Sequence, residues 1–201
     1  MESNCKVADV QDFNRRASSY EDSRRQSYLF DRVQRVVLNL ARAQNHPNAI
    51  LDVGCGTGRL LRKAQELWPN ARLVGVDAAE KMIEEAKKLF PKAGFHVAMA
   101  EYLPLPDASV DLVFSTLSFH HWTNQAKGVS EVARVLRPQG RFLLADIVPP
   151  FGLSLFSRHF KHNDPEKMRE MFVEAGLAVE LQQRQWRWSR FLVVTVGKPL
   201  T

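Results

Sequence analysis

Three glycines at alternate positions, with one aspartate before them and another after them, are the strongest candidate for a binding site in this sequence. They are Gly54, Gly56 and Gly58, in the segment DVGCGTG (52–58). Glycines permit a tight turn and let a ligand approach the backbone. A helix that begins after such a turn offers the ligand unpaired amide groups and a positive potential. Asp77 follows about 20 residues later, where an acid can bind ribose hydroxyl groups.

The spacing of these residues argues against a dinucleotide ligand. A dinucleotide site prefers G-x-G-x-x-G, but the sixth position is Arg59 when counted from Gly54 and Leu61 when counted from Gly56. Asp52, directly before the turn, would repel a pyrophosphate and suits a ligand that carries an ammonium group. The sequence therefore predicts a ligand with a ribose and a cationic end.

Alternating apolar runs and amphipathic stretches predict the elements that position this turn. The expected strands are residues 49–53, 71–77, 95–100, 110–116 and 141–148. The expected helices are residues 58–68, 79–90, 125–136 and 165–176. This rhythm predicts an α/β fold, with helices on both faces of a mostly parallel sheet. Residues 178–185 and 191–196 predict two more strands, antiparallel because their connection is short, so that a C-terminal hairpin completes a seven-stranded sheet.

Residues 1–48 are expected to form an N-terminal helical cap on a domain of residues 49–201. Apolar residues between Tyr28 and Leu40 recur at a spacing of three to four, as in an amphipathic helix, and Pro47 ends the pattern. A chain of 201 residues fits one globular unit that includes the cap.

Composition and charge limit the classes of partner. The net charge is +6, and residues 181–201 hold four basic residues and no acidic one. A basic surface favours acidic partners such as nucleic acid, but a solubilising surface is the simpler interpretation. Cys5 and Cys55 are expected to be reduced thiols in a cytoplasmic protein. No apolar run approaches the roughly 20 residues that span a bilayer, so no stable membrane insertion is expected.

Further motifs complete a resemblance to a known family. DVGCGTG (52–58) and VGVDAA (74–79) resemble the first two motifs of the class I S-adenosylmethionine-dependent methyltransferases. Three later segments are similar to the family's remaining motifs: AEYLPLPDASVDLV (100–113), SFHHW (118–122) and EVARVLRPQG (131–140). FNRRASSY (13–20) resembles the N-terminal pattern of the ubiquinone/menaquinone-type C-methyltransferases and related small-molecule enzymes. The resemblance implies a Rossmann-like fold, and its motifs are specific for the cofactor but hardly for the acceptor.

The resemblance implies S-adenosylmethionine as the cofactor and assigns residues to it. Asp52 is expected to hold its ammonium group, Asp77 its two ribose hydroxyl groups, and Tyr20 to close over it. The other residues expected at the cofactor are Gly54, Cys55, Gly56, Gly58, Ala78, Met82, Met99, Ala100, Glu101 and Ser115. Met99 stands where the family usually has an aspartate that binds the adenine amine, so adenine is expected to rely on backbone groups or on Glu101.

Four residues are candidates for a role in catalysis. His120 and His121 follow the fourth strand, at the edge where such folds bind ligands. Each is either a general base or substrate hydrogen-bond partner, or part of a histidine pair that packs on Trp122. Asp146 ends the fifth strand, and Tyr20 offers an aromatic face to a sulfonium. No cluster has the spacing of metal ligands, so no metal is expected.

The expected function is in-line methyl transfer to an oxygen, carbon or nitrogen atom of a small organic molecule. The acceptor site is expected to be roofed by residues 9–30, by residues 151–162 or by a second subunit. Phe151, Leu153, Leu155 and Phe156 would make this roof apolar, so an apolar or aromatic acceptor is expected. One alternative is an RNA or protein methyltransferase that uses the basic tails, with Trp186 and Trp188 stacking on bases. Another is a non-catalytic cofactor-binding domain. A dehydrogenase is the least favoured, and the sequence predicts no oligomeric state.

Overall fold

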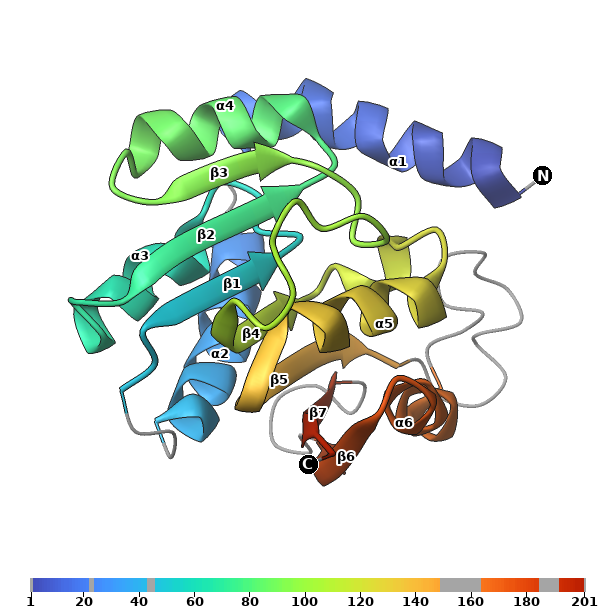
Figure 1. Ribbon diagram of the computed structural model, residues 1–201. Coiled ribbons are helices and arrows are strands. Elements are labelled where there is room, and N and C mark those ends of the chain that lie inside the picture. The colour runs from blue at the N-terminus through green and yellow to red at the C-terminus, as the bar shows by residue number, and fades with distance from the viewer. Residues whose placement is uncertain (1, 22–23, 43–45, 149–163, 185–191, 201) are drawn as a thin grey trace.

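A seven-stranded sheet forms the centre of the computed structural model, which describes residues 2–21, 24–42, 46–148, 164–184 and 192–200 (Figure 1). The strands are β1 (Ala49–Val53), β2 (Arg72–Asp77), β3 (Gly94–Val97), β4 (Val110–Thr116), β5 (Leu136–Ile147), β6 (Leu177–Arg184) and β7 (Leu192–Pro199). Their order is β3-β2-β1-β4-β5-β7-β6. Strands β1 to β5 are parallel, and β7 lies antiparallel between β5 and β6. The predicted α/β fold with a C-terminal antiparallel pair is confirmed.

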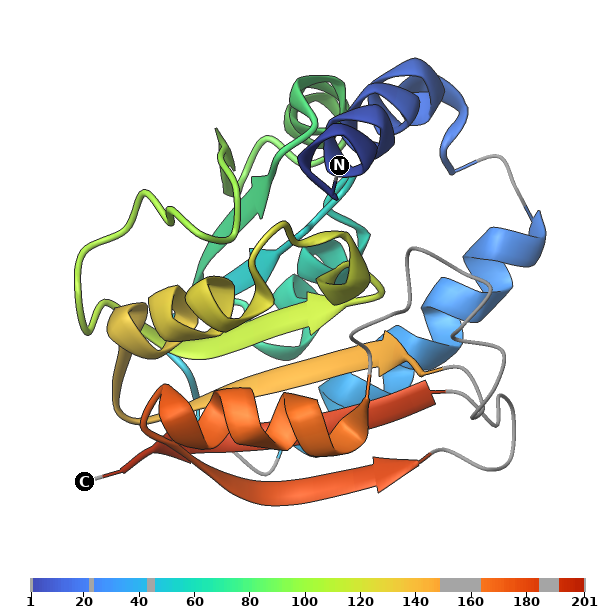
Figure 2. The same cartoon turned by 90° about the vertical axis from the view of Figure 1, so that its right-hand side faces the viewer.

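Helices cover both faces of the sheet, as the alternating pattern predicts. They are α1 (Glu2–Arg16), α2 (Arg24–Ala41), α3 (Arg59–Leu67), α4 (Glu80–Leu89), α5 (Gln125–Val135) and α6 (Pro165–Glu174), with short 3-10 helices η1 (Ala17–Ser19) and η2 (Phe119–His121). Figures 1 and 2 show α5 and α6 on one face and α2 and α3 on the other, with α1 beside α4. Each face has its own apolar core, one against α5 and α6 and one against α2, α3 and α4. Among the helices described, none has the length and apolar character needed to cross a membrane.

Strand β5 begins earlier than the sequence pattern predicts. Leu136 pairs with Val110 directly after α5, and the register then shifts so that Arg141 pairs with Leu112. Residues 137–140 are therefore an insertion opposite Asp111, which contains Pro138. The Asp111 carboxylate stabilises this insertion, because it accepts hydrogen bonds from the Arg137 guanidinium at 3.0 Å and from the backbone of Asn48 and Ala49. Pairing across such an insertion depends on the neighbouring strand and cannot be read from the strand's own sequence.

Gly197 in β7 leaves room for an aromatic pair that joins α6 to the sheet. A Cβ atom at Gly197 would lie 2.5 Å from Phe172 Cδ1. The Phe172 ring cannot move away easily, because it is buried and stacks on Phe142 with ring centroids 5.0 Å apart. A side chain at Gly197 therefore forces the ring or the strand to shift.

Gly197→Ala is therefore expected to destabilise the protein by about 1–3 kcal/mol, the usual cost of overpacking a core. For a chain of this size, each 1 kcal/mol lowers the melting temperature by about 2–4 °C. Thermal unfolding followed by circular dichroism measures the change. Gly94→Ala is the matched control in edge strand β3, because the nearest atoms to its Cβ lie 3.8 Å away. Equal melting temperatures for the two variants would contradict this account of Gly197.

Candidate functional site

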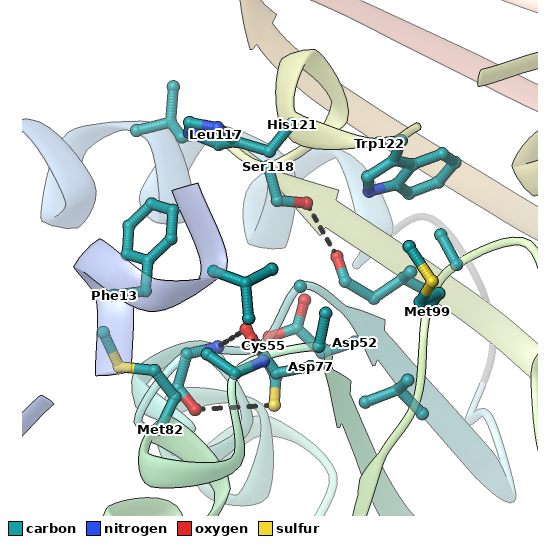
Figure 3. Close-up of a pocket in the computed structure, with 18 of the residues that line it drawn as sticks. Phe13, Asp52, Cys55, Asp77, Met82, Met99, Leu117, Ser118, His121 and Trp122 are labelled. Atoms are coloured by element: carbon teal, nitrogen blue, oxygen red, sulfur yellow. Dashed lines mark hydrogen bonds between the residues drawn. The ribbon is translucent and has the colours of Figure 1, made fainter. Parts of the chain in front are cut away.

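A cavity of about 480 Å³ opens at the carboxyl ends of the central parallel strands (Figure 3). This volume is within the usual range for a small-molecule site. Its wall is formed by the turn after β1, the ends of β2 and β4, the segment after β3, and residues of α1 and α2. Figure 3 shows Asp52 and Asp77 on one side of the cavity, with His121 and Trp122 across from them.

The glycine turn presents bare backbone to this cavity. Gly54 has a φ of 76°, and a Cβ atom there would collide with the Ser118 side chain. Ser118 closes the turn from the other side, since its hydroxyl donates to the Val53 carbonyl at 3.0 Å. The amides of Gly54 and Cys55 both donate to the Val76 carbonyl, which ties the turn to β2. Only glycine at position 54 allows the turn and the loop after β4 to pack this closely.

Cys55 lies in this turn and lines the cavity. Burial is the main cause that raises the pKa of its thiol, and Asp77 and Asp52 raise it further. The thiol therefore stays protonated and makes a poor nucleophile, because the thiolate is the reactive form. Cys55 therefore offers the cavity its backbone and the bulk of a protonated side chain.

The Asp77 carboxylate joins the glycine turn to the start of α4. It accepts hydrogen bonds from the backbone amides of Gly56 and Ala79, each at 2.8 Å. Burial raises the pKa of Asp77, while these two hydrogen bonds act against that rise. A carboxylate offers about four acceptor positions, so Asp77 can bind further donors, such as a pair of ribose hydroxyl groups, while it holds the turn.

Asp52 is a buried carboxylate on the cavity wall that lacks a hydrogen bond to its Oδ1 within the described part of the chain. Burial, together with the nearby Asp77, raises its pKa to about 8. A buried polar atom without a partner costs on the order of 1–3 kcal/mol. A cationic donor bound in the cavity would remove that cost. The site thus fits a ligand with an ammonium group, as the sequence predicts.

The wall beyond Asp77 is mostly apolar. Ala78, Met82, Met99 and Ala100 line it, and Met99 is 42% exposed at the edge. Glu101 also lines the cavity, but it is buried and its Oε1 accepts from the Asn124 amide at 2.6 Å, just before α5. The apolar side chains of this wall suit the faces of a flat ring. The Glu101 carboxylate is already bonded to the protein backbone.

Four of the residues predicted for the site lie behind the wall rather than on it. Gly58 packs against Phe95 at the start of α3, and Ser115 is buried and bonded to the Ser118 hydroxyl at 2.9 Å. His120 and Asp146 form a buried pair, in which one carboxylate accepts from the His120 backbone and pairs with its Nδ1 at 2.7 Å. The structure therefore gives these four residues supporting positions.

His121, next along the chain, does line the cavity. Its Nδ1 lies 3.0 Å from Oδ2 of Asp9, and the Phe13 ring meets its imidazole edge to face at 5.0 Å. Burial is the main cause that lowers the pKa of His121 to about 4, with a further contribution from His120. The Asp9 carboxylate acts against this fall, but the imidazole is neutral at ordinary pH.

Tyr20 and its aromatic neighbours close the cavity from the N-terminal side. Phe13, Tyr20 and Phe30 all line it, with the Tyr20 ring 6.2 Å from Phe13 and 5.9 Å from Phe30. Glu21 fixes the end of this segment, because it accepts from the Thr57 hydroxyl at 2.6 Å and from Arg62 at 2.5 Å. Burial alone would raise the pKa of Glu21, but these two donors hold it below its ordinary value.

Tyr20 was predicted at the site, and residues 9–30 were one of the expected roofs, from which Asp9, Phe13 and Phe30 line the cavity. Gln34 and Leu117 also line it and were not predicted. The apolar periodicity of residues 28–40 indicated a buried helix face, but it could not show which residues reach a ligand. The predicted apolar roof at 151–156 and the tryptophans at 186–188 lie outside the described residues. Within the described ranges, no group of three or more His, Cys, Asp or Glu side chains is placed to hold a metal ion.

Comparison with known proteins points to one kind of domain. Residues 51–144 match the family described as "Methyltransferase domain". The uncharacterized methyltransferase YcgJ of Bacillus subtilis is 37% identical over 130 residues, which are 60% of this chain and 50% of that protein. Demethylmenaquinone methyltransferase of Deinococcus radiodurans is 35% identical over 127 residues, or 58% of this chain and 51% of that protein. The chain thus spans about half the length of the curated relatives it matches.

A solved structure shares almost the whole fold. It is the complex between the Haloferax volcanii Trm112 methyltransferase activator and the putative methyltransferase, with a TM-score of 0.74. The match covers 94% of this chain and 98% of that chain, at 23% sequence identity. At this identity the likeness shows the fold alone.

Proposed function

We propose that this chain binds S-adenosylmethionine in the cavity and transfers its methyl group to a small organic molecule, and the match of residues 51–144 to the family described as "Methyltransferase domain" supports this proposal. The observation that carries the proposal is the buried carboxylate of Asp52 on the cavity wall, whose Oδ1 lacks a partner among the described residues. The amino-acid end of the cofactor offers the ammonium group that such a carboxylate needs. Asp77 lies next to the same turn and has acceptor positions for ribose.

Each part of the cavity has a counterpart in this cofactor. Asp52 pairs with the ammonium group, the turn at 54–56 brings backbone against the amino-acid end, and Asp77 binds the ribose hydroxyl groups. Ala78 and Met82 pack on the adenine ring. When bound, the cofactor supplies a methyl group on a positively charged sulfur, which is already electrophilic. The chain therefore has to orient the two reactants and keep water out, which by itself can supply a large part of the rate enhancement.

The acceptor would lie on the side of the cavity that α1 and α2 cover. Phe13, Tyr20, Phe30 and Leu117 make this side apolar and largely aromatic. Their faces suit a flat organic molecule, and aromatic faces also stabilise a nearby sulfonium much as they hold quaternary ammonium groups. The relative from Deinococcus radiodurans is named for demethylmenaquinone, which agrees with an apolar acceptor of this kind. A cytoplasmic location is part of the proposal and is supported by the free, buried thiol of Cys55.

Isothermal titration calorimetry with S-adenosylhomocysteine and with NADH tests the cofactor assignment. We expect S-adenosylhomocysteine to bind with one site per chain and NADH to give no measurable heat. Binding of NADH without S-adenosylhomocysteine would contradict the proposal and favour a dehydrogenase.

Methyl transfer is tested with S-adenosylmethionine labelled in the methyl group and a panel of aromatic hydroxyl, amine and quinol acceptors, with bulk RNA as a further acceptor. Label is expected in a small-molecule product. Label in RNA alone would overturn the assignment to small molecules, and cofactor binding without any transfer would support a non-catalytic domain.

A further inference from the structure

Helix α1 forms part of the cavity wall, and two of its residues one turn apart contact the same histidine. Asp9 and Phe13 both line the cavity, and both contact His121 from the loop after β4. The carboxylate binds one ring nitrogen and the phenyl ring packs on the imidazole at an interplanar angle of 89°. Together they hold the plane and the rotation of the imidazole.

Helix α1, which carries Asp9, is anchored by contacts that do not involve His121. The Asn14 side chain accepts from the Lys81 amide at 2.9 Å, in the first turn of α4. Ala17, directly after α1, forms a small core with Ala79 and Met82. Asp77 binds the same end of α4 through the Ala79 amide. Helix α1 is therefore anchored to the element that the ribose-binding carboxylate also holds.

The contact between Asp9 and His121 also determines which ring nitrogen carries the proton. An ionised carboxylate is only an acceptor, so in the neutral imidazole the hydrogen must lie on Nδ1, and Nε2 keeps a lone pair. An imidazole oriented in this way by a carboxylate has the arrangement of a general base. His120 differs, because its partner Asp146 is completely buried and neither residue lines the cavity.

We propose that Asp9 is a positioning residue that holds His121 as the proton acceptor for a hydroxyl group on the acceptor molecule. This inference rests on the proposed function and adds the chemical class of the acceptor. In the transfer, the acceptor oxygen forms a bond to the methyl carbon while the bond from that carbon to sulfur breaks. The electron pair of the broken bond goes to sulfur, and the hydroxyl proton goes to Nε2 of His121. The Asp9 carboxylate then balances the charge of the imidazolium.

A hydroxyl is the acceptor that needs such a base. A hydroxyl group holds its proton tightly at neutral pH. The proton becomes strongly acidic only as the oxygen forms its bond to the methyl carbon, and a neutral imidazole in place can then take it. A thiol, with an ordinary pKa near 8.5, is partly ionised before it binds and gains little from a base. The requirement for Asp9 should therefore depend on the acceptor atom.

The tautomer of His121 is the first test, measured by long-range ¹H–¹⁵N NMR on the full chain with and without S-adenosylhomocysteine. We expect the Nδ1–H form in the native protein and a shift toward the Nε2–H form in Asp9→Ala. Asp12→Ala is the matched control, because it removes a carboxylate from α1 that pairs only with Arg15 and Arg16 among the contacts described. An Nε2–H form in the native protein, or the same spectrum in native and Asp9→Ala, would overturn the inference. If the native protein does not bind S-adenosylhomocysteine, the result contradicts the proposed function instead.

The second test compares 2-naphthol with 2-naphthalenethiol as acceptors. Removing a general base costs about 10²–10⁴-fold in rate, so Asp9→Ala, which only disorients it, is expected to lower kcat for the naphthol at least tenfold with KM within twofold. Transfer to the thiol is expected to stay within twofold, and Asp12→Ala to match the native protein with both. An equal loss of kcat in Asp9→Ala with both acceptors would show that Asp9 has only a structural role and would overturn the inference. If neither acceptor is methylated, the tautomer measurement alone decides.

Discussion

Replacing Asp77 with alanine is expected to lower the affinity for S-adenosylhomocysteine by about a hundredfold or more. Two hydroxyl groups of the ribose would lose their bonds to a charged acceptor, each worth about 1.5–3 kcal/mol, and every 1.4 kcal/mol is tenfold in affinity. The variant also leaves the Gly56 and Ala79 amides without their acceptor, so the turn that faces the amino-acid end of the ligand loosens as well. Calorimetry measures the affinity, and the melting temperature without ligand reports the loosened turn.

Two further variants separate binding from folding. Asp77→Asn keeps one oxygen to accept from a backbone amide, so its melting temperature should lie closer to that of the native protein while its affinity stays low. Glu80→Ala removes a neighbouring acid from the exposed first turn of α4 and should change neither property. Unchanged affinity in Asp77→Ala would mean that the ribose binds elsewhere and would contradict the site proposed here.

The parts of the site that lie within one stretch of sequence were predictable. The run from Asp52 to Gly58 combines a strand end, a turn and a helix start, and these local features place Asp52, Gly54 and Gly56 on the cavity wall. Asp77 follows for the same reason, because parallel strands end at one edge of the sheet. The alternation of strands and helices likewise predicted which strands pair parallel and which antiparallel, because short connections force antiparallel pairing and helical crossovers allow parallel pairing.

The orientation of neighbouring side chains was not predictable in this way. His120 and His121 are consecutive residues in the 3-10 helix η2, yet one pairs with buried Asp146 and the other lines the cavity. Which histidine faces which way depends on β5 and α1, which are distant in sequence. Asp9 lies in the range 9–30 expected as one possible roof, but its contact with His121 could not be predicted, because a single acid on an amphipathic helix is most often on a solvated face. Its position becomes clear only from the packing of α1 on α4 and η2.

Asp52→Asn is expected to stabilise the empty protein and to do so increasingly as the pH rises. The pKa of Asp52 is raised from 3.8 to about 8 in the folded chain, chiefly by burial. A raised pKa means that the neutral carboxyl stabilises the fold below about pH 4 and that this stability is lost progressively as the pH rises to about 8. Asparagine does not titrate, so the variant avoids the loss.

The measurement is the difference in melting temperature between Asp52→Asn and the native protein at pH 5 and at pH 8, without ligand. We expect this difference to grow by at least about 1 kcal/mol from pH 5 to pH 8, which is about 2–4 °C for a chain of this size. A constant difference for Asp52→Asn would mean that its carboxyl group is not shielded from water.

The same substitution should have the opposite effect on binding, and this reversal identifies Asp52 as a ligand-binding residue. An ammonium group beside Asp52 lowers the pKa of the carboxyl, so binding of S-adenosylhomocysteine below pH 8 must release a proton from it. Calorimetry at pH 6 in two buffers of different ionisation enthalpy is expected to show release of about one proton for the native protein and almost none for Asp52→Asn. At pH 8 the variant should bind at least about tenfold more weakly, since a hydrogen bond to a charged group is worth about 1.5–3 kcal/mol. The unpaired carboxylate of Asp52 lowers the stability of the empty protein, whereas the carboxylate paired with an ammonium group adds affinity. If Asp52→Asn is more stable and still binds S-adenosylhomocysteine as tightly as the native protein, Asp52 is buried for another reason.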